Sequence, residues 1–155
     1  MSAADKSMVP QRPPPTYSFT SAVMRANSGK NTSPELRVRA LLRKAGYPGY
    51  RLHWKAASGT PDIAYPGRRI AIFVNGCYWH QCPSCKPRPP KSNARFWLSK
   101  FEDTASRDQR NQAALLAEGW RVFVIWECEL RNPETTQRRI GEIEAVLRET
   151  PCAPS

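Results

Sequence analysis

The chain has 155 residues, 40% of them hydrophobic and 24% charged, which predicts one folded, soluble domain rather than a disordered chain. Lys and Arg number 24 against 13 Asp and Glu, so the net charge is +11 and a polyanion, most simply nucleic acid, is the expected partner. No apolar run could cross a bilayer and the N-terminus lacks a signal-peptide core, so we expect a cytoplasmic protein with reduced cysteines. Membrane spans, collagen-like repeats and a secreted disulfide scaffold are excluded.

Both ends of the chain are predicted to lie outside the folded domain. Residues 1–21 are rich in proline, with three prolines in a row, which indicates a disordered or extended tail. Residues 22–33 are polar with two basic side chains, as in a loop or in an arm that orders on DNA. Residues 151–155 form a second tail, so the domain spans 22–150.

The first half of the domain is expected to form a helix and then a hairpin. The helix begins after Ser33, a plausible N-cap, with Pro34 at its first position. A strand over 50–54 follows, and then a hairpin over 61–75 with a Pro-Gly-Arg-Arg turn. The run from Ile70 to Val74 is apolar throughout and predicts a buried central strand.

The second half begins with residues 75–92, a Cys-, Pro- and Lys-rich loop that something other than hydrophobic packing must hold. A long helix runs from about 93 to 118, with Ser92 as a candidate cap. A buried strand over 120–126 and a helix from 133 to about 148 close the domain. This order of elements predicts a mixed β-sheet flanked by helices, an α/β architecture.

Three cysteines, Cys77, Cys82 and Cys85, fall within nine residues, and Cys128 follows a predicted strand. Four thiolates suit tetrahedral Zn²⁺, and a site closed by four protein ligands is structural. It would stabilise a loop with few apolar groups and staple it to the sheet. The alternative is a set of free buried cysteines, which the polar segment disfavours, and His80 could replace one thiolate.

Oxygen ligands for a second cation are expected at the mouth of the hairpin. Asp62 opens the hairpin beside a strand that ends in Asn75. Mg²⁺ held there would polarise a scissile phosphate and stabilise the departing oxygen, although a Pro-Asp pair alone is usually a turn. Glu35 lies in the first helical turn, either as a partner of the helix dipole or as a carboxylate on a metal-bound water.

One histidine and one aspartate are candidates for proton transfer. His80 could act as a general base near neutral pH, or serve as a zinc ligand or a hydrogen-bonded loop residue. Asp108 lies near the apolar face of the long helix, where a carboxylate needs a partner, and orienting His80 would supply one. The alternative is a surface pair with Arg107. His53 has no cluster around it and is interpreted as a strand or surface histidine.

Aromatic pairs flank the basic part of the loop. Tyr78-Trp79 and Phe96-Trp97 suit insertion into a DNA base stack, although packing over the loop is the competing interpretation and is favoured for Phe96. The basic side chains between the pairs could grip phosphates: Lys86, Arg88, Lys91 and Arg95.

These features include short motifs that are specific in combination: Met24-Arg, Ser33-Pro-Glu, Gly59-Thr-Pro-Asp-Ile, Asn75-Gly-Cys-Tyr-Trp-His, Pro90-Lys-Ser-Asn, Phe96-Trp, Arg107-Asp and Gly119-Trp-Arg-Val-Phe-Val-Ile-Trp-Glu-Cys. Over roughly residues 22–131 the chain resembles the very short patch repair (Vsr) DNA mismatch endonucleases. The resemblance implies a restriction-endonuclease-like core with a structural zinc. It also implies Mg²⁺-dependent nicking 5′ to the thymine of T·G mismatches that arise from 5-methylcytosine deamination. Such an enzyme would be a bacterial, nucleoid-associated monomer, with mismatch-repair proteins and a DNA cytosine methyltransferase as further partners.

The resemblance also implies residue roles. Asp62 would be the principal Mg²⁺ ligand and the main-chain carbonyl of Val74 a second, His80 the general base supported by Asp108, and Glu35 would act through metal-bound water. The zinc ligands would be Cys77, Cys82, Cys85 and Cys128. The DNA contacts would include a wedge and an N-terminal arm with nearby basic groups: Tyr78, Trp79, Trp97, Met24, Arg25, Lys91 and Arg95.

Three departures from the family pattern stand out. Some relatives carry His where this chain has Asn75, which can hydrogen-bond water but cannot titrate. Some relatives use a His in the zinc set, whereas four cysteines are available here. Phe73-Val-Asn replaces the restriction-enzyme carboxylate-x-Lys pattern, so the base must be an imidazole. The alternatives are a related nuclease of other specificity and a non-catalytic, zinc-bearing DNA-binding module.

Overall fold

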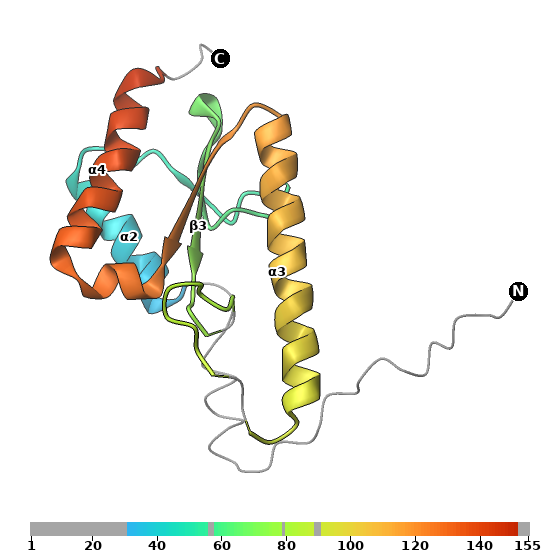
Figure 1. The fold of residues 1–155 in the computed structure, drawn as a ribbon. Coiled ribbons are helices and arrows are strands. Elements are labelled where there is room, and N and C mark those ends of the chain that lie inside the picture. Colours follow the sequence, from blue (N-terminus) through green and yellow to red (C-terminus); the bar gives the residue numbers. More distant parts are fainter. Residues whose placement is uncertain (1–30, 56–57, 79, 89–90, 152–155) are drawn as a thin grey trace, which may run out of the picture.

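A computed structural model describes residues 31–55, 58–78, 80–88 and 91–151. A thin central sheet is covered by helices on both faces (Figure 1). The order of elements confirms the predicted mixed α/β architecture. The tail predicted over 1–21 and all but the last three residues of the 22–33 arm lie outside the described residues.

The sheet has four strands in the order β1-β2-β3-β4. The first two pairs are antiparallel, which confirms the hairpin, and β3 pairs with β4 in parallel. The predicted strand over 50–54 is only two residues long, because His53 has a φ of 48° and leaves the extended conformation. The strand bounds are Arg51–Leu52 for β1, Ile63–Tyr65 for β2, Ile70–Asn75 for β3 and Arg121–Trp126 for β4.

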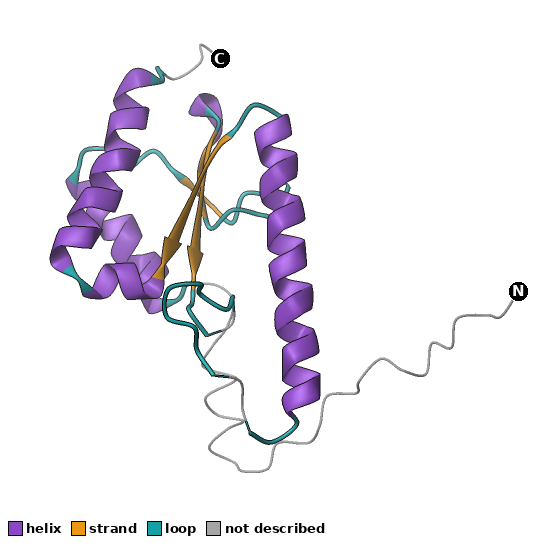
Figure 2. Ribbon diagram, viewed as in Figure 1, coloured by secondary structure: helices purple, strands orange, loops and turns teal. Residues whose placement is uncertain are grey.

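Helices α2 (Ser33–Lys44) and α4 (Pro133–Glu149) cover one face of the sheet, and α3 (Ala94–Ala117) covers the other (Figure 2). Val38, Leu42 and Ile143 pack against the β-strands in the main core, and burying each such side chain contributes about 1.5–3 kcal/mol. Leu115 of α3 packs on the opposite face of the sheet, against Ala71. The helices on both faces explain why β3 is a buried central strand, as predicted.

Strand β4 was expected to be buried, and this is wrong for most of its length. Only Ile125 is fully buried, while Arg121 is exposed. The physical reason is that β4 is the last strand in the order, so it has a neighbour on one side only.

Helix boundaries differ slightly from the prediction. Thr32, not Ser33, caps α2, because its extended backbone lets the Oγ1 accept the Glu35 amide at 3.4 Å. Asn93, in the left-handed conformation, precedes α3, so Ser92 is not its cap. Gly119 has a φ of 87° and ends that helix as expected.

Helix α3 determines where the loop after β3 lies. With 24 residues it is about 36 Å long, whereas a six-residue strand spans about 20 Å. Its first turns therefore extend beyond the sheet at the carboxyl ends of β3 and β4, beside that loop (Figure 1). Among the described residues, no helix is both long and apolar enough to span a membrane.

Candidate active site and metal centre

The hairpin brings the start of β2 beside the end of β3. Asp62 directly precedes β2, and its Oδ2 accepts the Val74 amide at 2.8 Å. This hydrogen bond fixes the carboxylate at the edge of the sheet where β3 and β4 end. Asn75, the last residue of β3, is only 5% exposed at the same edge.

Glu35 is buried in the first turn of α2, with 2% of its surface exposed. Its Oε2 accepts the Asn31 amide at 3.1 Å and pairs with Arg39, one helical turn later, at 3.1 Å. Burying the Glu35 carboxylate without the positive charge of Arg39 would cost free energy. The side chain therefore belongs to a buried ion pair and does not serve only as a partner of the helix dipole.

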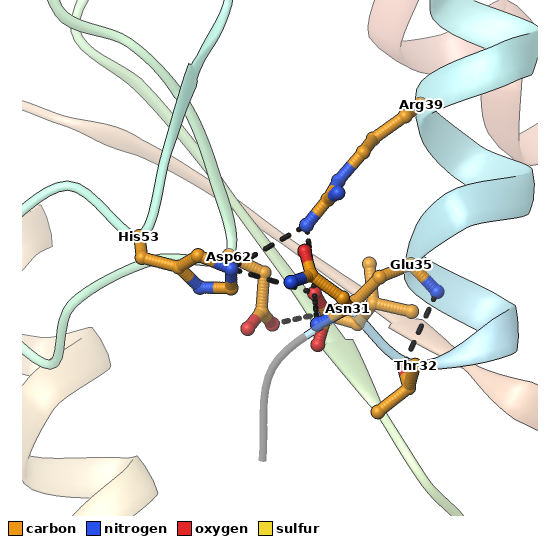
Figure 3. Close-up of polar contacts among 7 residues, drawn as sticks. Asn31, Thr32, Glu35, Arg39, His53 and Asp62 are labelled. Atoms are coloured by element: carbon orange, nitrogen blue, oxygen red, sulfur yellow. Dashed lines mark hydrogen bonds and ion pairs between the residues drawn. The ribbon is translucent and has the colours of Figure 1, made fainter. Parts of the chain in front are cut away.

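His53 does not stand alone, and its interpretation as an isolated strand or surface histidine is wrong. Its Nε2 lies 3.9 Å from Glu35 Oε2 and 3.4 Å from a guanidinium nitrogen of Arg39. Its backbone amide donates to the Asp62 carbonyl at 3.1 Å. Ligand atoms of His53, Glu35 and Asp62 all lie within 4.8 Å of one another (Figure 3), so together they could hold a cation.

Burial raises the pKa of Asp62 to about 6, and the nearby Glu35 carboxylate adds to the rise. The Val74 amide and the charges of His80 and Arg39 act in the opposite direction. Because burial disfavours the ionised form of this carboxyl group, a bound cation would stabilise that form. This agrees with the expectation that Asp62 is a Mg²⁺ ligand.

His80 is held by the helix on the other face of the sheet. Its Nδ1 lies 2.6 Å from Asp108 Oδ2 of α3, and its amide donates to the Gly76 carbonyl at 3.2 Å. The geometry thus brings together the pair that the sequence predicted, in preference to a surface pair of Asp108 with Arg107. The charge of His80 lowers the pKa of Asp62, so the two groups are within electrostatic range of each other.

The four described cysteines, Cys77, Cys82, Cys85 and Cys128, form a compact cluster in which all sulfurs lie within 4.8 Å. Two sulfur pairs, Cys82 with Cys128 and Cys77 with Cys85, are 3.8 Å apart. A tetrahedral zinc with Zn–S bonds of about 2.3 Å requires sulfurs roughly 3.8 Å apart. These two pairs match a tetrahedral metal and the remaining sulfurs lie close enough to complete it, while His80 is turned to Asp108 rather than to the sulfurs.

Backbone amides stabilise two of these sulfurs as thiolates. The Cys128 amide donates to Cys77 Sγ at 3.3 Å. Burial works against the Cys82 thiolate, but amides of Cys85 and Ser84 lower its pKa overall. Burial raises the pKa of Cys77 and Cys128, and a bound metal would favour the thiolate form of both.

The aromatic side chains gather on the first turns of α3. The rings of Tyr78 and Phe101 meet edge-on, with their centroids 5.4 Å apart. The ring centroid of Trp97 lies 5.1 Å from that of Phe96 and 6.3 Å from that of Phe101. Phe96 is buried, as the packing interpretation predicted, while Tyr78 and Trp97 are half-buried. Their insertion into DNA stays a prediction.

The other predicted DNA contacts fall into two groups. Lys91 and Arg95 are exposed around the start of α3. Met24, Arg25 and Trp79 lie outside the described residues.

Sequence reasoning missed Arg39 and His53. The spacing of Glu35 and Arg39, four residues apart in a predicted helix, signalled an ion pair. The position of His53 gave a weaker signal. It comes shortly before the Gly-Thr-Pro-Asp turn, and strands on either side of a turn often pair, which would bring His53 close to Asp62.

A buried carboxylate site, a carboxylate-supported imidazole and a cysteine cluster lie where β3 and β4 end, on a chain of net charge +11, and these are groups that a nuclease can use. The family model described as DNA mismatch endonuclease Vsr matches residues 16–86. The chain belongs to the Vsr family, and the prediction of an endodeoxyribonuclease is confirmed.

Curated relatives are similar over most of their length. Type II nicking enzyme V.XorIIP of Xanthomonas oryzae is 47% identical over 81% of this chain and 87% of its own. Type II nicking enzyme V.NmeAIP of Neisseria meningitidis is 35% identical over 86% and 95%. DNA mismatch endonuclease Vsr of Escherichia coli is 35% identical over 72% and 70%.

Proposed function

We propose that the chain is a Mg²⁺-dependent endonuclease that nicks one strand of double-stranded DNA 5′ to the thymine of a T·G mismatch, the lesion left by deamination of 5-methylcytosine. The observation that supports it best is the joint placement of Asp62 and the His80–Asp108 pair at one edge of the sheet. Its relatives, named as mismatch and nicking endonucleases, support the same reaction.

In this proposal Asp62 and the Val74 main-chain carbonyl would hold Mg²⁺, and the ion would supply positive charge to stabilise the scissile phosphate and the leaving 3′ oxygen. Asp108 accepts the Nδ1 proton of His80 and so leaves Nε2 free to take a proton from the attacking water. Glu35 would orient a water molecule near the ion, and Asn75 would hydrogen-bond water without titrating.

The thiolate cluster holds a structural Zn²⁺ in the same proposal. All four positions of a tetrahedral ion are filled by protein, so no open position is left for substrate. Its task is to fix the loop that carries His80. The core is of the restriction-endonuclease type and spans residues 22–150.

DNA is bound by the basic surface around the start of α3, with Lys91 and Arg95 on phosphates. Tyr78, Trp79 and Trp97 form the wedge beside the mismatch, and residues 22–33, with Met24 and Arg25, form the arm. A cytosine methyltransferase and mismatch-repair proteins are the further partners expected from the lesion.

A nicking assay tests the proposal. T·G, T·A and C·G duplexes of one sequence are incubated with and without Mg²⁺, and the position of the nick is mapped on both strands. We expect cleavage of the T·G duplex alone, only with Mg²⁺. Cleavage of matched DNA alone would favour a related nuclease of other specificity.

The matched variant is Asp62→Asn, which keeps the shape of the side chain and its bond to the Val74 amide but removes the charge. Nicking should fall by about 10³-fold or more while DNA affinity stays within about twofold, because the charge acts on the cation rather than on the duplex. An active Asp62→Asn enzyme would remove Asp62 from the mechanism.

A further inference from the structure

Arg39 is a buried arginine that connects two separate elements of the carboxylate site. It lies on α2, one helical turn after Glu35, and only 8% of its side chain is exposed. Its Nη2 lies 3.1 Å from Glu35 Oε2 and 3.4 Å from His53 Nε2 (Figure 3). The same guanidinium nitrogen therefore contacts a side chain of its own helix and a side chain that directly follows β1.

The chemistry of arginine fixes the direction of the contact with His53. A guanidinium keeps its charge and can only donate hydrogen bonds, so His53 Nε2 accepts here and the ring carries its proton on Nδ1. Glu35 Oε2 accepts from the same group. Arg39 is therefore a charged donor placed between two acceptors that belong to different elements.

His53 is tied in turn to Asp62 through the main chain. Its amide donates to the Asp62 carbonyl at 3.1 Å, and the amide of Trp54 donates to the Pro61 carbonyl at 3.2 Å. These two hydrogen bonds continue the pairing of β1 with β2 as far as the residue that carries the Asp62 carboxylate. Arg39 thus links the helix that carries Glu35 to the strand end that carries Asp62.

Such a link matters because the two carboxylates repel each other. Their oxygens lie within 4.8 Å, and the charge of Glu35 raises the pKa of Asp62. A charged donor on Glu35 offsets this repulsion and restricts the side chain to one rotamer. A misplacement of about 1 Å in an active site can lower a rate by about 10²-fold, so the effect of losing the link should be measurable.

We infer that Arg39 is a positioning residue for the nicking reaction, and that it holds the Glu35 carboxylate in place relative to Asp62 by bridging Glu35 and His53. The inference rests on the proposed function, in which both carboxylates act in cleavage. Arg39 acts through Glu35 and not on the DNA, because its guanidinium is buried.

The test is a double-mutant cycle on the zinc-loaded full-length chain. Its readout is the single-turnover rate of nicking a T·G duplex with Mg²⁺ at saturating enzyme. Arg39→Met removes the charge and both contacts but keeps much of the bulk. It should lower the rate by about 10- to 10²-fold and leave DNA affinity within about twofold.

The second arm of the cycle removes the carboxylate. Glu35→Gln should lower the rate at least as much as Arg39→Met. The double variant should nick as slowly as Glu35→Gln alone, because Arg39 acts through a carboxylate that is already gone. A residue that merely stabilises the fold would lower the rate further in both backgrounds.

Three further variants accompany the cycle. Arg39→Lys keeps the charge and a donor and should recover most of the rate. His53→Asn removes the ring at a φ of 48°, which Asn tolerates, and should lower the rate as Arg39→Met does but by less. Arg43→Met removes an exposed arginine from the same helix and should keep the wild-type rate.

A full rate in Arg39→Met or His53→Asn, or losses that multiply in the double variant, would overturn the inference and leave the proposed function intact. If circular dichroism shows that Arg39→Met is unfolded, Arg39→Gln takes its place in the cycle. Failure of both to fold would make the role of Arg39 structural and would also overturn the inference. A wild type that nicks no T·G duplex would instead overturn the proposed function, and the inference with it.

Discussion

Two clusters of ligand atoms lie at the same edge of the sheet, and they are built in opposite ways. The sulfur cluster draws all four donors from cysteines and leaves no position open. The carboxylate cluster of Glu35, His53 and Asp62 mixes oxygen with nitrogen and already contains the guanidinium of Arg39. The first cluster would be complete with a metal alone, whereas the proposed function requires the second to accept water and a phosphate as well.

The two clusters have different tasks in this proposal: the cysteine cluster stabilises a loop, and the carboxylate cluster carries the reaction. The loop after β3 has few apolar groups, so a metal can stabilise it where packing does not. Glu35 and Asp62 instead lie at the starts of α2 and β2, where regular elements hold their side chains in the fixed positions that the proposed catalytic roles require.

The largest expected effect comes from the sulfur cluster. Cys82→Ser, or removal of the metal with a strong chelator, should unfold the loop and abolish nicking, because structural zinc sites contribute about 10–16 kcal/mol of apparent binding energy. Metal analysis should find about one zinc per chain in the wild type, and limited proteolysis should reveal the opened loop. Cys152→Ser changes a cysteine that is not among the four proposed ligands; it is the control, and this variant should retain one zinc. A chelated protein that resists protease would show that packing alone holds the loop.

Asp108→Asn should have the next largest effect, a loss of about 10²-fold in single-turnover nicking, because a neutral amide does not stabilise the protonated imidazole. DNA affinity should not change. Asp103→Asn changes an exposed carboxylate on the same helix and should retain full activity. Equal rates for the two variants would remove Asp108 from proton transfer.

The difference in the pH dependence of stability between the wild type and Asp62→Asn probes the carboxylate cluster. The pKa of Asp62 rises from 3.8 to about 6 on folding through burial, so the folded state binds the proton more tightly than the unfolded state. Without a divalent ion, stability should fall as pH rises from about 4 to about 6, by on the order of 2–3 kcal/mol.

The measurement is urea denaturation of the wild type and of Asp62→Asn across that range, because other carboxylates titrate in both proteins. The difference between the two curves should change between pH 4 and 6, and Mg²⁺ should reverse the loss above pH 6. Parallel curves would mean that Asp62 ionises freely.

The smallest expected effect concerns the turn that leads to Asp62. Gly59 has a φ of 77°, and a Cβ there would lie 2.6 Å from the Cβ of Asn111 on α3. Gly59→Ala should therefore cost about 1–3 kcal/mol in the free energy of unfolding and shift Asp62. Gly49→Ala, where nothing lies within 4 Å, should cost less than about 1 kcal/mol. Equal thermal denaturation midpoints would show that the turn can relax.

Local patterns in the sequence predicted most of the fold. The apolar run from Ile70 to Val74 predicts the central strand, and the Pro-Gly-Arg-Arg turn predicts the hairpin. The cysteine spacing predicts the sulfur cluster, because three of its ligands share one loop. The predicted N-caps of α2 and α3 each differ by one residue from those in the structure, because neighbouring polar residues compete for the capping position.

The sequence by itself determined which chemical groups the chain carries and which of them are local neighbours. Only the tertiary structure decided that His53 meets the Glu35–Arg39 pair, and that β4 is the last strand of the sheet. Arg39 and His53 come from a helix and a strand end whose relative placement depends on packing across the core. Such contacts form because α2 packs on the sheet in one particular position, and the periodicity of a short stretch of sequence does not specify that position.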